Sequence, residues 1–341
     1  MFIRSKAPLR LGFAGGGTDV SPFSDTFGGA VLNATIDLFA HVVIEPIAEP
    51  KAIFRSVDQR TDFGCALGAE PNTQCDGNIP CGVYRRFVKD YGPAPSGFVL
   101  TTFVDAPAGS GLGTSSTLTV ATVAAFADFF GVGLGEYDMA HLAFEIERSD
   151  LGLAGGKQDQ YAAAFGGFNF MEFGPGQNVV VNPLRLKMEI ISELESSLVL
   201  FYTGMSRSSA RIIDAQSKNI SAGRQHSVDA MIHLKEQAVC MKEAVLKGQL
   251  NKFGEILSYG WRLKKETAAE VSNPLIDEIF ECAQQAGSSG GKISGAGGGG
   301  FIMFYCPGVN RYAVIDALGR FGGECRRFQF VQYGVVTWRT A

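Results

Sequence analysis

The sequence predicts an α/β protein that is divided into two domains. Segments typical of strands alternate with segments typical of helices, and this alternation starts afresh near residue 185. The chain has 341 residues, of which 46% are hydrophobic, so it is long enough to bury two cores. We therefore expect an N-terminal domain over residues 1–185 and a C-terminal domain over residues 186–341.

The N-terminal half begins with runs that are typical of strands: Met1–Lys6, Ala30–Ile36, Phe39–Pro46, Ala52–Val57 and Phe98–Thr102. Helices are expected over four further segments, which are Asn78–Tyr91, Thr117–Phe130, Tyr137–Asp150 and Gln158–Phe165. Gly166 and Gly167 then turn the chain into a strand at Phe168–Phe173.

The C-terminal half repeats the alternation. Strands are expected at Glu189–Ser192, Leu198–Tyr202, Lys292–Ser294, Gly300–Tyr305 and Phe328–Val336. Apolar residues recur at roughly helical spacing between residues 228 and 247, which predicts a long helix there. Further helices are expected at Ser208–Lys218, Leu250–Trp261 and Pro274–Ala286.

The composition argues against two classes of partner. The net charge is −4, whereas nucleic-acid binding usually requires a basic face. No run approaches the ~20 apolar residues that a membrane span needs, and the first residues lack the apolar core of a signal peptide. We expect no nucleic-acid partner, no membrane partner and a cytoplasmic location, while the oligomeric state stays open.

The seven cysteines are scattered, and no two of them form a Cys-x-x-Cys pair. Cys65, Cys75 and Cys81 are close in sequence, but no histidine accompanies them, so a zinc site is not favoured. We expect free thiols, as in a reducing compartment.

The most informative stretch is residues 107–117, Pro-Ala-Gly-Ser-Gly-Leu-Gly-Thr-Ser-Ser-Thr, between a predicted strand and a predicted helix. Glycines let the backbone approach a ligand closely, and the start of a helix attracts anions. A tight turn with hydroxyl caps is the structural alternative. Because glycine and hydroxyl residues are so dense here, we favour a triphosphate site. Its expected residues are Pro107, Gly109, Ser110, Gly111, Leu112, Gly113, Thr114, Ser115 and Ser116.

This loop has neither the Gly-Lys-Ser/Thr ending of a Walker A loop nor the glycine spacing of a Rossmann fingerprint. It resembles the ATP-binding motif of the GHMP kinases, the superfamily of galactokinase, homoserine kinase and mevalonate kinase. Two further motifs resemble that family in the expected order. They are residues 7–19, Ala-Pro-Leu-Arg-Leu-Gly-Phe-Ala-Gly-Gly-Gly-Thr-Asp, and residues 292–301, Lys-Ile-Ser-Gly-Ala-Gly-Gly-Gly-Gly-Phe.

The resemblance covers most of the chain and carries several implications. It implies an N-terminal domain like domain 2 of ribosomal protein S5 and a ferredoxin-like C-terminal domain, with the active site in the cleft between them. It also implies ATP as the phosphate donor and Mg²⁺ as its metal ion.

Phosphoryl transfer needs charge stabilisation, alignment and a group that receives the hydroxyl proton. Glu147 lies late in a predicted helix, and Asp159 follows 12 residues later. Galactokinase-like members place an acidic residue at the same distance before their catalytic aspartate. By this resemblance, Asp159 is the catalytic carboxylate, and Glu147 ligates Mg²⁺ together with Ser116. The residues alone leave a solvated helix position for Glu147 and a helix N-cap for Asp159 open.

The first glycine motif supplies Arg10 and Asp19. Some GHMP kinases carry Lys or Arg at the place of Arg10, where a cation helps bring the acceptor hydroxyl to the catalytic Asp. The motif keeps the Thr-Asp of galactokinase but not its Glu-His, which argues against galactose and for another sugar. The expected sugar-binding residues are Gly16, Gly17, Thr18 and Asp19. A surface position for Arg10 and a turn cap for Asp19 are the alternatives.

Three segments resemble the heptose 7-phosphate kinase branch, with fucokinases as near relatives: residues 15–19, 155–167 and 202–207. A sugar that already carries phosphate needs a further cation in its pocket. Lys157 and Arg207 are the candidates for this role. Lys157 could contact the γ-phosphate of ATP instead, and Arg207 could be a surface residue at a helix start.

The C-terminal loop 295–300 holds five glycines in six residues. So much glycine costs folding entropy, and we expect this loop to close over the substrates through Gly297 and Gly298. A plain glycine-rich hairpin is the alternative.

Together, these motifs predict an ATP-dependent sugar kinase. The resemblance implies that it phosphorylates the anomeric hydroxyl of D-glycero-D-manno-heptose 7-phosphate to the 1,7-bisphosphate, for nucleotide-activated heptose and surface glycans. The first alternative is a kinase for L-fucose or another unphosphorylated sugar. The second, from another class, is a non-catalytic sensor of sugar and ATP.

Overall fold

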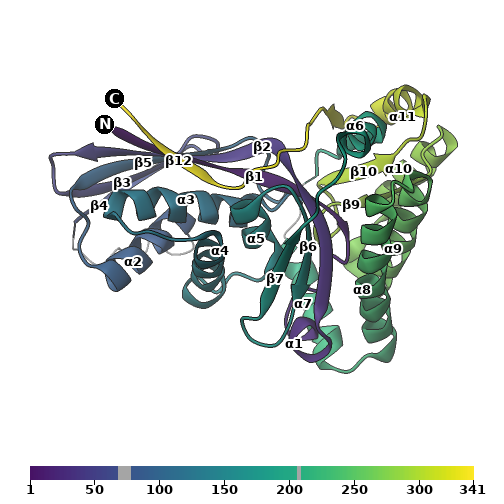
Figure 1. The fold of residues 1–341 in the computed structure, drawn as a ribbon, viewed down its shortest axis with the longest axis horizontal. Coiled ribbons are helices and arrows are strands. Elements are labelled where there is room, and N and C mark those ends of the chain that lie inside the picture. The colour runs from purple at the N-terminus through teal and green to yellow at the C-terminus, as the bar shows by residue number, and fades with distance from the viewer. Residues whose placement is uncertain (68–77, 206–208) are drawn as a thin grey trace.

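The computed structural model describes residues 1–67, 78–205 and 209–341. Within these ranges the protein is a mixed α/β structure with one sheet of eight strands and one of four. The larger sheet and its helices form one side of the molecule, and the smaller sheet with the long helices α8 (Gln225–Leu246) and α9 (Phe253–Thr267) forms the other (Figure 1). The predicted α/β fold class is confirmed.

The larger sheet has the strand order β12-β1-β2-β5-β3-β4. In addition, β6 pairs with the first part of β2, residues 29–34, and β7 pairs with β6. Neighbouring strands are antiparallel, except for the parallel pair β3 and β5. The strands are β1 (Phe2–Ala14), β2 (Gly29–Ile47), β3 (Lys51–Ser56), β4 (Thr61–Ala66), β5 (Gly97–Val104), β6 (Phe168–Phe173), β7 (Val179–Pro183) and β12 (Val336–Thr340).

Helix α3 (Thr114–Phe130) is the central helix of this half and lies along the larger sheet (Figure 1). Its residues are mostly buried, and the Ser5 hydroxyl of β1 donates a 2.5 Å hydrogen bond to the Ala121 carbonyl. Gly131 ends the helix with a left-handed φ of 72°. The other helical segments are α1 (Phe23–Phe27), α2 (Ile79–Tyr91), α4 (Glu136–Glu145), the π-helix η2 (Ile146–Asp150) and α5 (Gln158–Phe165).

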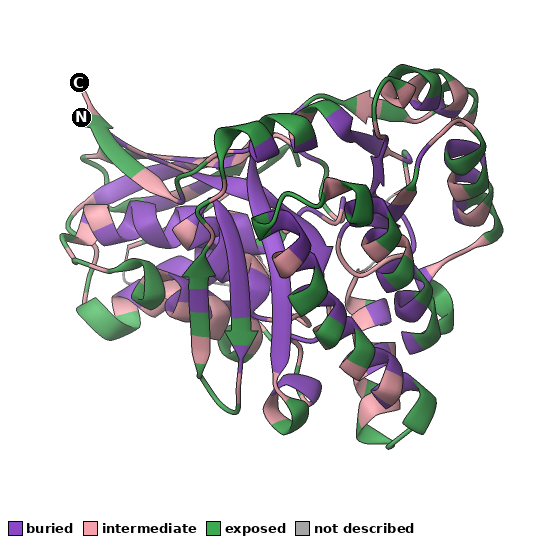
Figure 2. Cartoon of the chain, turned by 45° about the vertical axis from the view of Figure 1, so that its right-hand side comes forward, coloured by how far each residue is buried: buried purple, intermediate pink, exposed green. Residues whose placement is uncertain are grey.

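The smaller sheet has the order β11-β8-β10-β9, and all its pairs are antiparallel, as a ferredoxin-like domain would have. Strands β8, β9 and β10 are mostly buried, whereas the edge strand β11 is largely exposed, and the surrounding helices expose their outer faces (Figure 2). The elements besides α8 and α9 are α6 (Met188–Ser197), β8 (Leu198–Tyr202), α7 (Ser209–Ser221), η3 (Leu250–Lys252), η4 (Ala269–Val271), α10 (Pro274–Gln285), β9 (Gly290–Ile293), β10 (Phe301–Tyr305), α11 (Asn310–Leu318), η5 (Gly319–Phe321) and β11 (Glu324–Arg326).

The strand predicted at residues 189–192 is wrong, because this segment belongs to helix α6. Ile190, Ile191 and Leu194 are buried at helical spacing, and the residues between them are exposed. The adjacent isoleucines alone suggested a strand, whereas the spacing to Leu194 sets the helix.

The strand predicted at residues 328–336 is also wrong for most of its length. Only an isolated bridge between Ile36 and Phe330 forms there, and the last strand, β12, starts at Val336 and pairs with β1. The domain boundary near residue 185 stays a prediction. The structure adds that the chain returns to the larger sheet at its end.

The expectation of free thiols is wrong for Cys81, which is disulfide-bonded. The other described cysteines are free: Cys65, Cys240, Cys282, Cys306 and Cys325. Cys75 lies outside the described residues. The absence of a nearby histidine spoke against zinc, but it gave no information about a disulfide.

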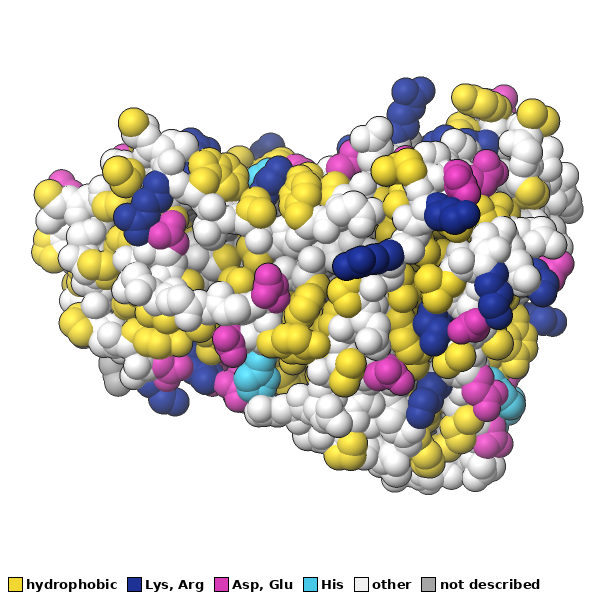
Figure 3. Space-filling view, viewed as in Figure 1, with side chains coloured by type: hydrophobic (Ala, Val, Ile, Leu, Met, Phe, Trp, Pro, Cys, Tyr) yellow, Lys and Arg dark blue, Asp and Glu magenta, His cyan; other side chains and the backbone are white. Residues whose placement is uncertain are grey.

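Acidic and basic side chains are interspersed over the face seen in Figure 3. Within the described ranges, the structure contains no helix that could serve as a membrane span.

Candidate active site

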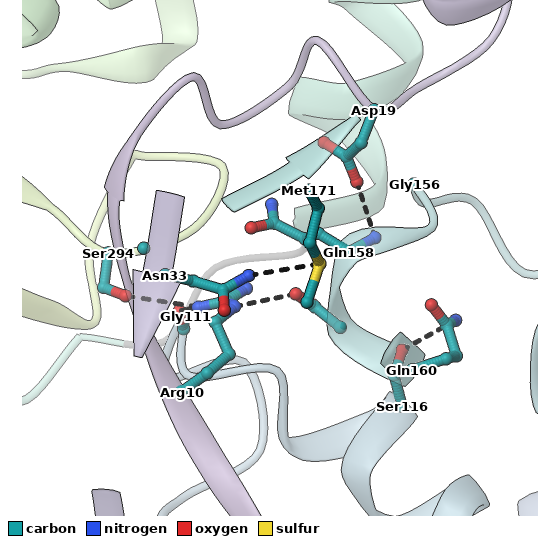
Figure 4. Close-up of polar contacts among 12 residues, drawn as sticks. Arg10, Asp19, Asn33, Gly111, Ser116, Gly156, Gln158, Gln160, Met171 and Ser294 are labelled. Atoms are coloured by element: carbon teal, nitrogen blue, oxygen red, sulfur yellow. Dashed lines mark hydrogen bonds and ion pairs between the residues drawn. The ribbon is translucent and has the colours of Figure 1, made fainter. Parts of the chain in front are cut away.

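A cavity of about 320 Å³ lies where the two halves meet. It is lined by the first glycine motif, the loop before α3, the segment from η2 to α5, the start of α7, helix α9 and the C-terminal glycine loop. The structure therefore brings all three sequence motifs to one place. Figure 4 shows Arg10, Gly111 and Ser294, which come from these three motifs, side by side.

The phosphate loop, residues 107–117, leads directly into α3. Gly113 precedes the helix with a left-handed φ of 77°, and Thr114 and Ser115 at the helix start line the cavity. The first N–H groups of a helix have no partner within the helix. Gly111 also has a left-handed φ, of 85°, and a Cβ there would lie 2.2 Å from the Ser294 carbonyl oxygen. The tight packing of this loop on the C-terminal loop therefore requires glycine at position 111.

Three residues of the phosphate loop do not line the cavity. Leu112 is fully buried, and its carbonyl accepts a 3.1 Å hydrogen bond from the Arg10 N–H. The Ser110 hydroxyl is buried without a hydrogen-bond partner. Pro107 is exposed at the start of the loop.

Arg10 and Asp159 form an ion pair in the cavity wall. The Arg10 Nε lies 2.7 Å from the Asp159 Oδ1, and its Nη1 donates to the Gly111 carbonyl at 2.6 Å and to the Ser294 hydroxyl at 3.2 Å. Asp159 is on the first turn of α5, where the helix N-terminus favours a carboxylate. Arg10 thus holds Asp159 beside the phosphate loop, and the carboxylate remains part of the cavity lining.

Glu147 lies in η2 and is buried, 1% exposed. Its carboxylate accepts hydrogen bonds from Ser116 Oγ at 2.8 Å, from Ser115 Oγ at 3.2 Å and from the Gln160 amide. The Gln160 Oε1 is buried and has no partner. The Glu147 carboxylate and the Ser115 and Ser116 hydroxyls are hard oxygen donors of the kind that Mg²⁺ prefers, so the donor set fits this ion. Among the described residues, no group of three or more His, Cys, Asp and Glu gathers as a metal site.

Asp19 lies in the turn after β1 and is almost fully buried. Its Oδ1 accepts a 3.2 Å bond from the Gly17 N–H, and its Oδ2 accepts a 3.0 Å bond from the Gln158 N–H (Figure 4). Burial raises the pKa of Asp19, and the negative charge of Asp159 raises it too, while the two N–H donors lower it. Gly156 packs against this carboxylate, since a Cβ there would lie 1.9 Å from Oδ2.

The other predicted sugar-binding residues differ in their placement. Gly17 lines the cavity, and the Gly16 carbonyl accepts a bond from Lys264. The Thr18 hydroxyl is fully buried and bonds to backbone atoms of Gly15 and Ala30, so it fixes the turn. These contacts give Thr18 a structural position beside the cavity.

Lys157 does not line the cavity. It is buried, its ammonium donates to the Gly176 carbonyl, and it lies 3.8 Å from Asp25. Arg207 lies outside the described residues. The phosphate roles of both residues stay predictions.

In the C-terminal loop, Gly295 and Ala296 line the cavity. The N–H of Gly298 donates to the Val271 carbonyl at 2.8 Å, and a Cβ on Gly297 would lie 2.8 Å from that same oxygen. Gly297 and Gly298 therefore pack on η4, and the roles predicted for them stay predictions.

Two buried lysines were missed by sequence reasoning. Lys264 of α9 lines the cavity, and its Nζ lies 2.8 Å from the Gly16 carbonyl oxygen. Lys292 of β9 donates to the Gly12 carbonyl at 2.7 Å. Burial lowers the pKa of Lys264 to about 8 and that of Lys292 to about 7. Lys264 stands beside another lysine in an amphipathic helix, so nothing in the sequence distinguishes it from a solvated residue.

Comparison with known proteins places these motifs in a family. Residues 78–167 match the GHMP kinases N terminal domain, and residues 241–324 match the GHMP kinases C terminal domain. The D-glycero-alpha-D-manno-heptose 7-phosphate kinase of Campylobacter jejuni is 44% identical over 339 residues, which are 99% of each chain. The bifunctional fucokinase/GDP-fucose pyrophosphorylase of Arabidopsis thaliana is 31% identical over 87% of this chain, but only 29% of that protein is covered.

Solved structures give the same picture. A D-glycero-D-manno-heptose 1-phosphate kinase from Bacteroides thetaiotaomicron has a TM-score of 0.84 and 42% identity, with 99% of both chains covered. Galactokinase from Lactococcus lactis, 18% identical, shares the fold with a TM-score of 0.78 over 98% of this chain and 95% of its own. The three motifs, the two matching domains and the full-length relative lead to one conclusion: the chain belongs to the GHMP kinases, a family that uses ATP as the phosphate donor.

Proposed function

We propose that this kinase transfers the γ-phosphate of ATP to the anomeric hydroxyl of D-glycero-D-manno-heptose 7-phosphate and forms the 1,7-bisphosphate. The observation that carries the proposal is the Arg10–Asp159 pair, which faces the same cavity as the phosphate loop. The 44% identity to a heptose 7-phosphate kinase over the full length supports the choice of sugar.

The reaction assigns a task to each part of the cavity. The anomeric oxygen attacks the γ-phosphorus, the bond from that phosphorus to the bridging oxygen breaks, and ADP leaves. Asp159 receives the hydroxyl proton, and Arg10 fixes the carboxylate at 2.7 Å so that it points at the acceptor. Asp19, held by two N–H groups, accepts hydrogen bonds from sugar hydroxyls.

The phosphate loop binds the triphosphate through its backbone N–H groups and the start of α3. Ser116 and Glu147 would hold Mg²⁺, which offsets negative charge on the triphosphate when it is bound.

The test measures ADP release with ATP and a panel of heptose 7-phosphate, free heptose, L-fucose, galactose and mevalonate. We expect turnover with heptose 7-phosphate at a kcat/KM far above that of the other acceptors. Preference for an unphosphorylated sugar would replace the substrate but keep the kinase. ATP binding without turnover of any acceptor would favour the sensor.

A further inference from the structure

We propose that Lys264 binds the phosphate group that the acceptor sugar already carries, and so makes this kinase selective for a phosphorylated sugar. This inference rests on the proposed function. Lys264 comes from α9 in the C-terminal half, is buried and reaches the cavity across the interface between the halves. Its Nζ lies 2.8 Å from the Gly16 carbonyl oxygen.

The Lys264 ammonium has N–H donors that no described residue accepts. It carries three N–H donors, and among the described residues one bond, to Gly16, is formed. Gly17 keeps the space in front of it open, because a Cβ at that position would lie 2.7 Å from the Nζ. A phosphate oxygen can therefore reach a cation that is already held in place.

The other cations near the cavity are engaged more fully. Arg10 bonds Asp159, the Gly111 carbonyl and the Ser294 hydroxyl. Arg148 donates to the Leu153 and Gly156 carbonyls and lies 3.5 Å from Glu147. Lys157 points its ammonium at Gly176, outside the cavity lining. Lys264 is thus the cavity-lining cation, among the described residues, with the fewest partners.

The charges around Asp19 also suit a phosphosugar. Asp19 lies within electrostatic reach of both Asp159 and Lys264. With the anomeric hydroxyl at Asp159 and ring hydroxyls at Asp19, the end of the sugar opposite to the anomeric carbon faces Lys264. In heptose 7-phosphate that end carries the phosphate.

Burial makes this contact sensitive to pH. Desolvation lowers the pKa of Lys264 to about 8, and Asp19 partly opposes this. Two charged groups lie within electrostatic reach of Lys264: Asp19, in the turn after β1, and Lys292 of β9. Lys292 in turn lies within reach of Arg10 of β1, and Asp19 within reach of Asp159 of α5. A phosphate dianion, whose second pKa is about 6, gains most from a charged ammonium in a site of low dielectric. Phosphosugar binding should therefore weaken above pH 8 as Lys264 loses its proton.

Lys264 has a structural alternative, since its bond to Gly16 joins the two halves. Lys292 provides a matched control for that role. It is also a buried lysine with a lowered pKa, and it also bonds a carbonyl of the first glycine motif, Gly12, at 2.7 Å, but it does not line the cavity.

The experiment compares Lys264→Met and Lys292→Met with the wild type, with heptose 7-phosphate and free heptose as acceptors. For Lys264→Met we expect the KM of heptose 7-phosphate to rise roughly 10- to 100-fold, the size expected for a lost hydrogen bond to a charged group, and the KM of free heptose to change far less. For Lys292→Met we expect both acceptors to change in parallel. Lys264→Arg should keep the preference for the phosphosugar.

Equal effects of Lys264→Met on the two acceptors would overturn the inference and leave the proposed function intact. The same holds if Arg207→Met selectively weakens the phosphosugar and Lys264→Met does not. A wild-type enzyme that does not use heptose 7-phosphate would overturn the proposed function as well. If Lys264→Met does not fold, the wild-type pH profile decides: the KM of heptose 7-phosphate should rise above pH 8, and a KM that stays flat to pH 9 contradicts the inference.

Discussion

The two ends of the cavity are built from different parts of the chain. The phosphate loop end is made of backbone from one continuous stretch, shaped by glycines such as Gly111 and Gly113 and by the start of α3. The end at which we propose that the acceptor binds, formed by Asp19, Gln158 and Lys264, is made of groups from three distant segments. Backbone recognition leaves a local pattern in the sequence, whereas recognition by scattered side chains leaves almost none.

The variant Asp159→Asn should distinguish most clearly between the contributions of the two cavity ends to turnover and to ATP binding. The amide keeps the shape but cannot take up the hydroxyl proton, so kcat should fall by about 10²–10⁴-fold. ATP binding should stay nearly unchanged, because the phosphate loop is intact. Single-turnover assays and ATP titration measure the two effects. Loss of ATP binding equal to the loss of turnover would show that the two ends are not separable.

Glu147→Gln tests the proposed Mg²⁺ site, in which Glu147 bonds Ser115 and Ser116 of the phosphate loop. We expect the Mg²⁺ concentration for half-maximal activity to rise by about 10- to 100-fold, because the amide is a weaker ligand. Glu145→Gln is the matched control, since this nearby carboxylate pairs with Arg86 on the surface side. An identical Mg²⁺ dependence of the two variants would remove Glu147 from the metal site.

Gly111→Ala tests whether the loop depends on backbone shape. Both Gly111 and Gly131 have left-handed φ values, 85° and 72°, but only at Gly111 would a Cβ meet another backbone atom, at 2.2 Å. Gly131→Ala should lower the free energy of unfolding by about 1–2 kcal/mol. Gly111→Ala should lower it further and weaken ATP binding, as measured by thermal unfolding and ATP titration. Equal behaviour of the two variants would speak against the tight contact with Ser294.

The last prediction concerns stability rather than activity, and it involves Lys292. Its pKa is about 7 in the folded protein and about 10.4 when unfolded. Between these values the unfolded chain binds more protons, so the free energy of unfolding rises with pH, by at most about 1.4 kcal/mol per pH unit. Lys292→Met lacks this contribution. Denaturant unfolding at pH 7, 8 and 9 should therefore give a difference, wild type minus Lys292→Met, that increases with pH; a constant difference would refute the buried, neutral lysine.

The same contrast explains how much could be predicted from the sequence. The fold class and the meeting of the three motifs at one cavity were predictable, since Arg10, Asp159 and the phosphate loop lie in short patterns. Lys264 was not, because Lys264 and Lys265 look alike in sequence and only tertiary packing buries the first and exposes the second. Helix α6 was missed for a similar reason, since its short apolar run also fits a strand.

Completion of the larger sheet depends on its last strand, β12. It pairs with β1 from Phe2↔Thr340 to Lys6↔Val336, so the first and last strands are neighbours, and the two ends of the chain lie side by side (Figure 1). β12 therefore covers the outer edge of β1 along residues 2–6. A chain without residues 336–340 would keep all the residues that line the cavity but expose an unpaired strand edge. Such an edge can pair with another chain, so loss of this five-residue strand would favour aggregation even though it leaves the cavity intact.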